Sequence, residues 1–104
     1  MITPHDISII IPVYNVAKYL PECLDSILVT NQFTGEVICI NDGSTDSSNN
    51  ILEQYAQRYP NIKHLSQQNQ GIGATRNNGL DIATGKYIFF IDSDDTIAPH
   101  AIET

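Results

Sequence analysis

Four short apolar segments, separated by longer segments with helical periodicity, constrain the fold of this chain more than any other feature. They are rich in β-branched or aromatic residues, which is typical of strands that are covered on both faces of a sheet. The four segments are Ile7–Ile11, which ends at Pro12, Val37–Ile40, Ile62–Leu65 and Tyr87–Ile91. The sequence therefore predicts four strands, of which the third is short and the other three are buried.

Apolar residues recur at helical spacing in each of the three segments between these strands. The first predicted helix spans about 17–30. The second follows the cap-rich run 44–47 and is marked by apolar residues from Ile51 to Ala56, and the third is marked by residues from Ile72 to Ala83 and ends at Gly85. Pro21 is tolerable in the first turn of the first helix, and Pro60 ends the second. We expect Gly85 to cap the C-terminus of the third helix, and a further helix to begin near Pro99.

The alternation of strands and helices, β-α-β-α-β-α-β, predicts a three-layer α/β/α fold with a mostly parallel sheet. A length of 104 residues is enough for one domain and not for two, so residues 1–104 are assigned to a single domain. In such sheets, ligands bind at the carboxyl ends of the strands, where the strand order reverses. The polar residues that follow the four strands should therefore converge on one edge of the sheet.

An acidic run, Asp92-Ser93-Asp94-Asp95, directly follows the fourth predicted strand. Three carboxylates this close repel one another, so they need a counter-charge or raised pKa values. A divalent cation is the simplest counter-charge, since Mg²⁺ and Mn²⁺ take oxygen ligands. Asp92 and Asp94 lie on one side if strand geometry continues. From position alone, a solvated acidic turn that caps the next helix is an equally good interpretation.

The ends of the first two strands carry further candidates, each with two interpretations. Asn41-Asp42-Gly43-Ser44 is either a strand–helix connector or the source of a carboxylate that accepts hydrogen bonds from a base or ribose. Tyr14 is either a packed aromatic or a platform for a base. Arg76 and Lys18 are either phosphate partners or surface charges.

Charge and apolar run length exclude some functions. A net charge of −7 with only five Lys and Arg argues against a nucleic-acid surface. No apolar run is long enough to span a bilayer, and the start of the chain has no pattern of a secretion signal, so we expect a cytoplasmic chain. Cys23 and Cys39 are expected to be buried free thiols.

Taken together, the segments resemble the inverting family 2 glycosyltransferases, whose nucleotide-sugar-binding half has the Rossmann-like GT-A fold. The resemblance extends from Ile7 to about Ile97, and the joint order and spacing of its stretches carry it. The matching stretches are Ile9–Asn15, Lys18–Leu20, Cys23–Ile27, Asn41–Asp46, Asn69–Gly71, Ala74–Gly79, Gly85–Tyr87 and Asp92–Asp95.

The resemblance implies a set of residues that bind the nucleotide sugar. Pro12 and Tyr14 would line the nucleotide pocket, and Asp42 would hydrogen-bond the base, which is usually uracil in this family. Arg76 lies in the family's loop–helix segment near the donor.

The acidic run would be the family's Asp-X-Asp motif. Asp94 would bind the Mn²⁺ or Mg²⁺ ion that bridges the donor diphosphate, and Asp92 would contact the ribose or the sugar. Asp92 and Asp95 are weaker candidates for the metal.

The implied reaction transfers a sugar from a nucleotide-diphosphate sugar, a UDP-sugar by preference, to a saccharide or lipid-linked acceptor in polysaccharide biosynthesis. A base deprotonates the acceptor hydroxyl. Family members normally continue into a second half with the acceptor site and this base, so we expect the base beyond Thr104 and expect this chain to bind donor without turnover. Association of the full-length protein with the cytoplasmic side of a membrane, and a homodimer that buries an exposed sheet flank, are left open.

Other functions compete with this one. An apolar strand followed by Asp-X-Asp-X-Thr, as in Ile91–Thr96, also suggests a haloacid-dehalogenase-like phosphatase with Asp92 as nucleophile and Asp94 as acid–base. That motif normally opens its domain. A dinucleotide-binding oxidoreductase would need a Gly-X-Gly-X-X-Gly turn after the first strand, which this sequence lacks. A non-catalytic module that binds nucleotide sugars stays open.

Overall fold

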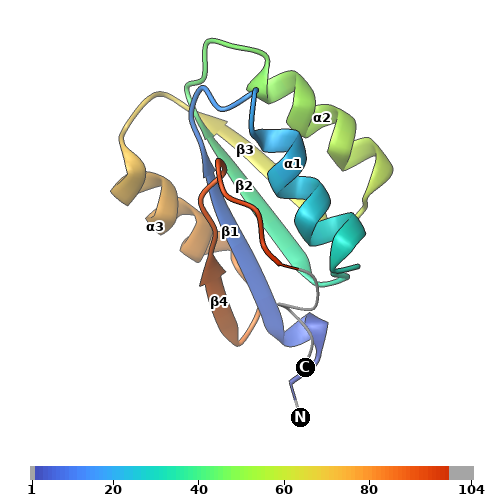
Figure 1. The fold of residues 1–104 in the computed structure, drawn as a ribbon. Helices are drawn as coiled ribbons and strands as arrows, with labels where there is room; N and C mark the ends of the chain where they lie inside the picture. Colours follow the sequence, from blue (N-terminus) through green and yellow to red (C-terminus); the bar gives the residue numbers. More distant parts are fainter. Residues whose placement is uncertain (1, 99–104) are drawn as a thin grey trace.

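A four-stranded parallel sheet forms the middle of the molecule in the computed structural model, which describes residues 2–98 (Figure 1). The strands are β1 (Ile7–Val13), β2 (Glu36–Asp42), β3 (Ile62–Gln67) and β4 (Tyr87–Phe90). Their order in space is β3-β2-β1-β4, and all neighbouring pairs are parallel. The prediction of four strands is confirmed, and β1, β2 and β3 each continue further than the apolar runs indicate.

β1 continues through Pro12, although a proline removes a backbone donor from the sheet. The carbonyl of Ile10 accepts a hydrogen bond from the Ile91 amide at 3.1 Å, so the backbone groups of residue 10 face β4. Backbone groups two residues apart on a strand face the same neighbour. β4 ends at Phe90, which is the register partner of Ile10. Pro12 therefore has no ladder bond to lose, and the strand runs through it.

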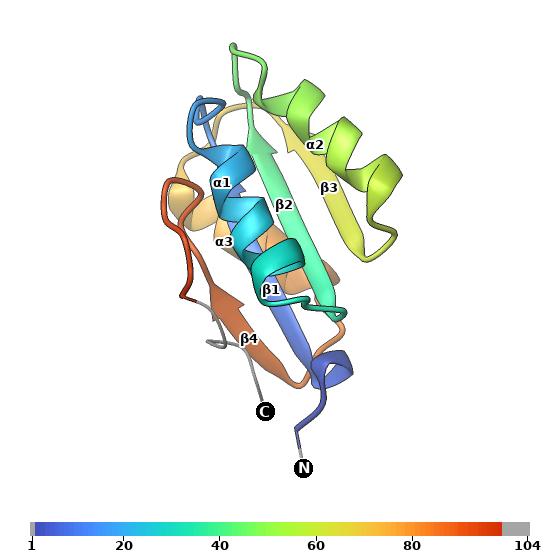
Figure 2. The same cartoon turned by 45° about the vertical axis from the view of Figure 1, so that its right-hand side comes forward.

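Helices cover both faces of the sheet, as predicted. The helices are α1 (Leu20–Asp25), which continues as a π-helical segment (Ser26–Thr30), α2 (Ser48–Arg58) and α3 (Ile72–Ile82); a short 3₁₀ helix (Pro4–Asp6) precedes β1. Figure 2 shows α1 and α2 in front of the sheet and α3 behind it. The first helix begins three residues later than predicted, because residues 17–19 form a turn in which the Ala17 amide donates to the Asp46 carboxylate and the Tyr19 amide donates to the Val16 carbonyl. The helix expected near Pro99 lies outside the described residues.

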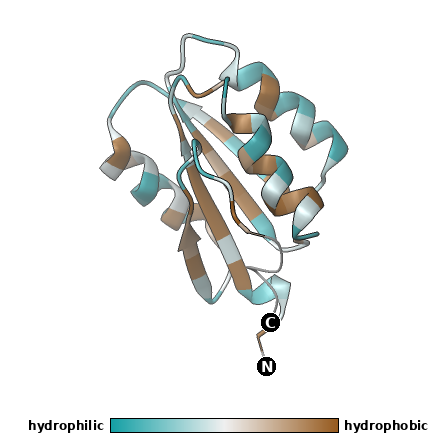
Figure 3. Ribbon diagram, viewed as in Figure 1, coloured by the Kyte–Doolittle hydropathy of each residue, from teal (hydrophilic) through white to brown (hydrophobic). Residues whose placement is uncertain are grey.

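The core is divided between the two faces of the sheet. Alternate residues of a strand point to opposite faces, and Ile9 and Ile11 accordingly pack in one cluster with Leu24 and Leu52 of α1 and α2. Ile10 packs in a second cluster under α3, with residues from β2. Figure 3 shows the hydrophobic residues concentrated in the central strands. Both cysteines are buried and free, as expected.

Gly85 does not cap α3, contrary to the sequence-based expectation. The residue after α3 is Ala83, in an extended conformation, and Gly85 is not among the glycines with positive φ. A Cβ on Gly85 would lie 2.7 Å from the backbone nitrogen of Ser8, and the Gly85 amide donates to the Ser8 hydroxyl at 2.9 Å. The glycine is thus needed for the close approach of two backbones at the start of β4.

β4 is an edge strand, so the prediction that it is buried on both faces is wrong. Tyr87, Phe89 and Phe90 are 44–47% exposed. Aromatic content alone does not distinguish a central strand from an edge strand, and in the described part of the chain only β1 pairs with β4. No helix among residues 2–98 is long and apolar enough to cross a membrane.

Candidate functional site

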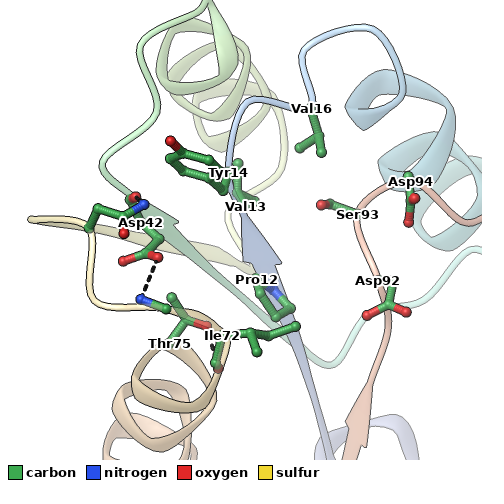
Figure 4. A pocket seen from close by; sticks show the side chains of 12 residues that line it. Pro12, Val13, Tyr14, Val16, Asp42, Ile72, Thr75, Asp92, Ser93 and Asp94 are labelled. Carbon is green, nitrogen blue, oxygen red and sulfur yellow. Dashed lines mark hydrogen bonds between the residues drawn. The ribbon is translucent and has the colours of Figure 1, made fainter.

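A pocket of about 430 Å³ lies at the carboxyl ends of the strands (Figure 4). It falls beside β1, which has β2 and β3 on one side and β4 on the other, so the strand order reverses there. Residues at the ends of β1 and β2 and in the segments after β1, β3 and β4 form its wall: Pro12, Val13, Tyr14, Val16, Asp42, Asn69, Gly71, Ile72, Thr75, Asp92, Ser93 and Asp94. The prediction that the segments after the strands converge on one edge is confirmed.

The loop after β1 is held in place by side chains of the loop after β2. Three successive backbone amides of the first loop donate to three side chains of the second. These bonds run from Asn15 to the Ser44 hydroxyl at 3.0 Å, from Val16 to the Ser48 hydroxyl at 3.2 Å and from Ala17 to the Asp46 carboxylate at 3.1 Å. Asp46 also accepts from the amide of Ser48, the first residue of α2, at 2.9 Å. Ser44, Asp46 and Ser48 thus fix the position of the loop after β1, which forms one wall of the pocket. Sequence reasoning missed this role.

Asn15 completes this contact between the two loops. Its φ of 50° is in the left-handed region, which asparagine tolerates better than most residues. Its side-chain oxygen accepts from the Thr45 amide at 2.7 Å and from the Asp46 amide at 3.3 Å. Tyr14 precedes this turn and is 50% exposed beside the pocket. Tyr14 is thus not packed in the core, and its ring borders the pocket.

Asp42 is almost fully buried at the end of β2, at 4% exposure. Its Oδ1 accepts from Gln67 Nε2 at 2.9 Å and from the Gln70 amide at 2.8 Å, and its Oδ2 accepts from the Gly71 amide at 3.0 Å. Burial acts to raise the pKa of Asp42, but these three hydrogen bonds outweigh it and hold the pKa below its ordinary value. Asp42 is therefore a carboxylate at neutral pH.

A carboxylate has about four acceptor sites, and three of those on Asp42 are taken by the protein. The remaining site is on Oδ2, in a residue that lines the pocket. The three donors were not identified from the sequence. Gln67 lies directly beside Asp42 through the register that pairs β2 with β3, which the sequence pattern does not supply.

The acidic run forms a turn rather than a continuation of β4. The Asp95 amide donates to the Asp92 carbonyl at 3.0 Å, and β4 has already ended at Phe90. The turn brings carboxylate oxygens of Asp92, Asp94 and Asp95 within 4.8 Å of one another, and all three side chains are exposed. Hard divalent cations prefer this donor set. Strand geometry does not continue into the run, but the turn gathers the three carboxylates all the same, and they fit a metal ion.

Asp92 and Asp94 line the pocket opposite Asp42 and Tyr14 (Figure 4). Asp95 is not among the lining residues. Ser93 lies between the two carboxylates and is buried, at 6% exposure. The pocket therefore has a hydrogen-bond acceptor and an aromatic ring at one end and two carboxylates at the other.

The two cations considered from the sequence do not line the pocket. Arg76 lies beside it, with a guanidinium nitrogen 3.9 Å from Asp92 Oδ1 and the guanidinium carbon 5.5 Å from the centre of the Phe90 ring. Exposed ion pairs of this length contribute little to stability. Lys18 lies over the ring of Tyr19. Arg76 is thus near the acidic run, whereas Lys18 is a surface charge.

Comparisons with known proteins place this geometry among sugar-transferring enzymes. The family model described as glycosyl transferase family 2 matches residues 8–104. The chain is 41% identical over 104 residues to the uncharacterized glycosyltransferase YibD of Escherichia coli, and 46% identical over 102 residues to the poly(ribitol-phosphate) beta-glucosyltransferase of Bacillus spizizenii. The match to YibD includes the whole of this chain and 30% of the length of YibD. The match to the beta-glucosyltransferase includes 92% of this chain and 16% of the length of that protein.

Solved structures show the same fold. TarS residues 1–349 of Staphylococcus aureus, in complex with UDP-GlcNAc, superposes with a TM-score of 0.86 at 36% identity, over 94% of this chain and 29% of that one. The mannosyltransferase PcManGT of Pyrobaculum calidifontis, solved with GDP-Man and Mn²⁺, has a TM-score of 0.82 at 24% identity, over 91% of this chain and 29% of that one. The expected GT-A fold is confirmed, and the phosphatase alternative is not favoured.

Proposed function

This chain belongs to glycosyl transferase family 2, and on that premise we propose that its pocket binds the nucleoside diphosphate of a nucleotide-sugar donor. The single observation that carries the proposal is the placement of Asp42 and the acidic run at opposite ends of one pocket. A donor of this class has a base at one end and a charged diphosphate next to the sugar. Asp42 can accept a hydrogen bond from the base, and the acidic run can hold a cation that balances the charge of the diphosphate.

We propose that the base is uracil. Asp42 has one acceptor site left, on Oδ2, and uracil presents one ring N–H. Guanine presents a ring N–H and an amino group side by side, which call for two acceptors. TarS, at 36% identity, was solved with UDP-GlcNAc and with UDP. Tyr14, half exposed at the same end of the pocket, is placed to stack on the base.

We propose that a divalent ion, Mn²⁺ or Mg²⁺, joins the diphosphate to the acidic run. Asp94 would be its principal ligand, with Asp92 and Asp95 as further candidates, since their oxygens lie within 4.8 Å of one another. When bound, such an ion neutralises diphosphate charge and stabilises the departing nucleotide. Without it, the carboxylates of a chain with net charge −7 would repel the donor. Arg76, close to Asp92, is a second source of positive charge near the sugar.

For the whole protein, we propose inverting transfer of the sugar to a saccharide or lipid-linked hydroxyl. The poly(ribitol-phosphate) beta-glucosyltransferase, at 46% identity, supports a polymer-forming role. The chain spans less than a third of the length of these relatives. We therefore propose an acceptor site and a base that deprotonates the acceptor for the whole protein, and not for residues 2–98. For residues 2–98 the proposal is limited to holding the donor.

Calorimetric titration of the chain with UDP, with and without Mn²⁺, tests the donor site. We expect UDP binding that depends on Mn²⁺, and a loss of at least about tenfold in affinity for Asp94→Ala. Asp81→Ala removes an exposed carboxylate from α3, outside the pocket, and should leave the affinity unchanged. UDP affinity that Asp94→Ala does not alter would contradict the metal assignment.

A further inference from the structure

Gln67 stands beside Asp42 at the end of the sheet. It is the last residue of β3, and the parallel register pairs it with Asp42, the last residue of β2. Its side-chain nitrogen donates to Asp42 Oδ1 at 2.9 Å. The other two donors to Asp42 are backbone amides of the loop before α3. Within residues 2–98, Gln67 is therefore the side chain that completes the hydrogen bonding of Oδ1.

The orientation of the Gln67 amide is set by a second amide on α3. Asn78 Nδ2 donates to Gln67 Oε1. A glutamine amide has an acceptor end and a donor end. If the Gln67 amide turned over, its NH₂ would face the NH₂ of Asn78, and its carbonyl would face the carboxylate of Asp42. With Asn78 in this orientation both contacts would be repulsive, so Asn78 reinforces the orientation of Gln67 that the acceptor-only carboxylate of Asp42 favours.

This pair of amides decides how many acceptor sites Asp42 offers to a ligand. Gln67 and the Gln70 amide together occupy Oδ1. The Gly71 amide takes one of the two sites on Oδ2. Loss of the Gln67 donor would free a site on Oδ1, and the carboxylate could then turn. A single fixed acceptor discriminates between bases better than two loosely held ones, because a mismatched donor or acceptor is left unpaired.

We propose that Gln67, oriented by Asn78, is a positioning residue that restricts Asp42 to one acceptor site and so makes the pocket selective for uracil over guanine. This inference rests on the proposed function of the pocket, since it assigns the origin of the base preference. Neither amide is itself among the residues that line the pocket. The pair acts on the ligand through Asp42.

The test compares isosteric substitutions, because these separate positioning from packing. Gln67→Glu keeps the shape of the side chain but sets a carboxylate against Asp42, whereas Gln67→Ala removes the donor and the volume. The affinities of the purified chain for UDP and for GDP, each with Mn²⁺, are measured by calorimetry. We expect UDP affinity to fall in the order wild type, Gln67→Ala, Gln67→Glu, with a loss of about tenfold or more at the first step. The ratio of UDP to GDP affinity should fall by a similar factor.

Gln68→Glu is the matched control, because Gln68 is the next residue, is exposed, and gains the same charge. It should bind UDP as the wild type does. Asn78→Asp acts at a distance: it replaces the donor to Gln67 by an acceptor, turns the Gln67 amide over, and should lower UDP affinity and selectivity. Asn77→Asp, on the exposed neighbour, controls for that charge and should have no effect. Mn²⁺ affinity and the circular dichroism spectrum check that each variant retains the fold.

A packing role for Gln67 predicts that Gln67→Ala weakens the binding of UDP and of GDP alike, because only side-chain volume is lost. An unchanged ratio of UDP to GDP affinity in folded Gln67 and Asn78 variants would therefore overturn the inference and leave the proposed function intact. A wild-type chain that binds neither nucleotide would overturn the proposed function, and the inference with it.

Discussion

Replacing Asn15 with alanine should loosen the contact between the loops after β1 and β2. Asn15 holds a φ of 50°, where a Cβ without a local hydrogen bond costs about 1 kcal/mol. Its side-chain oxygen also accepts from the amides of Thr45 and Asp46, at 2.7 and 3.3 Å. Both donors belong to exposed residues, so water replaces these bonds in part, and each contributes about 0.5 kcal/mol. We expect Asn15→Ala to lower the free energy of unfolding by about 2 kcal/mol.

Urea denaturation of three variants separates the two contributions. Asn15→Gly accepts the left-handed conformation but lacks the acceptor, so it should lose only about half as much stability as Asn15→Ala. Asn15→Asp keeps the acceptor and tolerates the conformation, so it should remain close to the wild type. UDP affinity should likewise be highest for Asn15→Asp, lower for Asn15→Gly and lowest for Asn15→Ala. The reason is that Tyr14, which lines the pocket, directly precedes the turn at Asn15. Equal stability of Asn15→Ala and Asn15→Asp would refute the reasoning.

Two further predictions address the base platform and the sheet end opposite the pocket. Tyr14→Ala should weaken UDP binding about tenfold through lost stacking, while Tyr14→Phe and the affinity for Mn²⁺ alone should stay unchanged; equal UDP affinity of Tyr14→Ala and the wild type would rule out stacking. Burial acts to raise the pKa of Glu36, but hydrogen bonds from Lys63, Thr84 and Ser8 outweigh it, so the pKa lies below its ordinary 4.5. A lowered pKa in the folded state stabilises the fold above the pKa of the unfolded chain, and this contribution is lost as pH falls through the folded-state value. Urea unfolding at pH 7 and pH 3 should therefore show Glu36→Gln less stable than the wild type at pH 7 and a smaller difference between the two at pH 3; an equal difference at both pH values would contradict this.

The sequence was most informative where a pattern depends on local burial. Parallel strands covered on both faces produce continuous apolar runs, and so β1 and β2 could be located from Ile7–Ile11 and Val37–Ile40. The same pattern failed for β4, because an edge strand with Phe89 and Phe90 looks like a central one. The end of β1 was not predicted because a proline usually ends a strand. Pro12 is tolerated in β1 because β4 ends at Phe90, so no backbone acceptor of β4 lies opposite the proline nitrogen.

The candidate site was predictable at the level of strand ends and not at the level of contacts. The order of strands and helices places Tyr14, Asp42 and Asp94 on one edge, and the structure brings them around one pocket. The donors to Asp42 and the acceptors for the loop after β1 come from residues 25 to 32 positions away. Such pairs depend on the register of β2 with β3 and on loop packing, which no local pattern encodes.

The binding mode itself tests the central claim most directly. A crystal structure of the chain with UDP and Mn²⁺ should place the uracil N–H against Asp42 Oδ2. It should also show an anomalous peak for the metal at about 2.2 Å from an Asp94 oxygen, between the acidic run and the diphosphate. UDP bound away from the carboxyl ends of the strands, or a metal held without Asp94, would contradict the account.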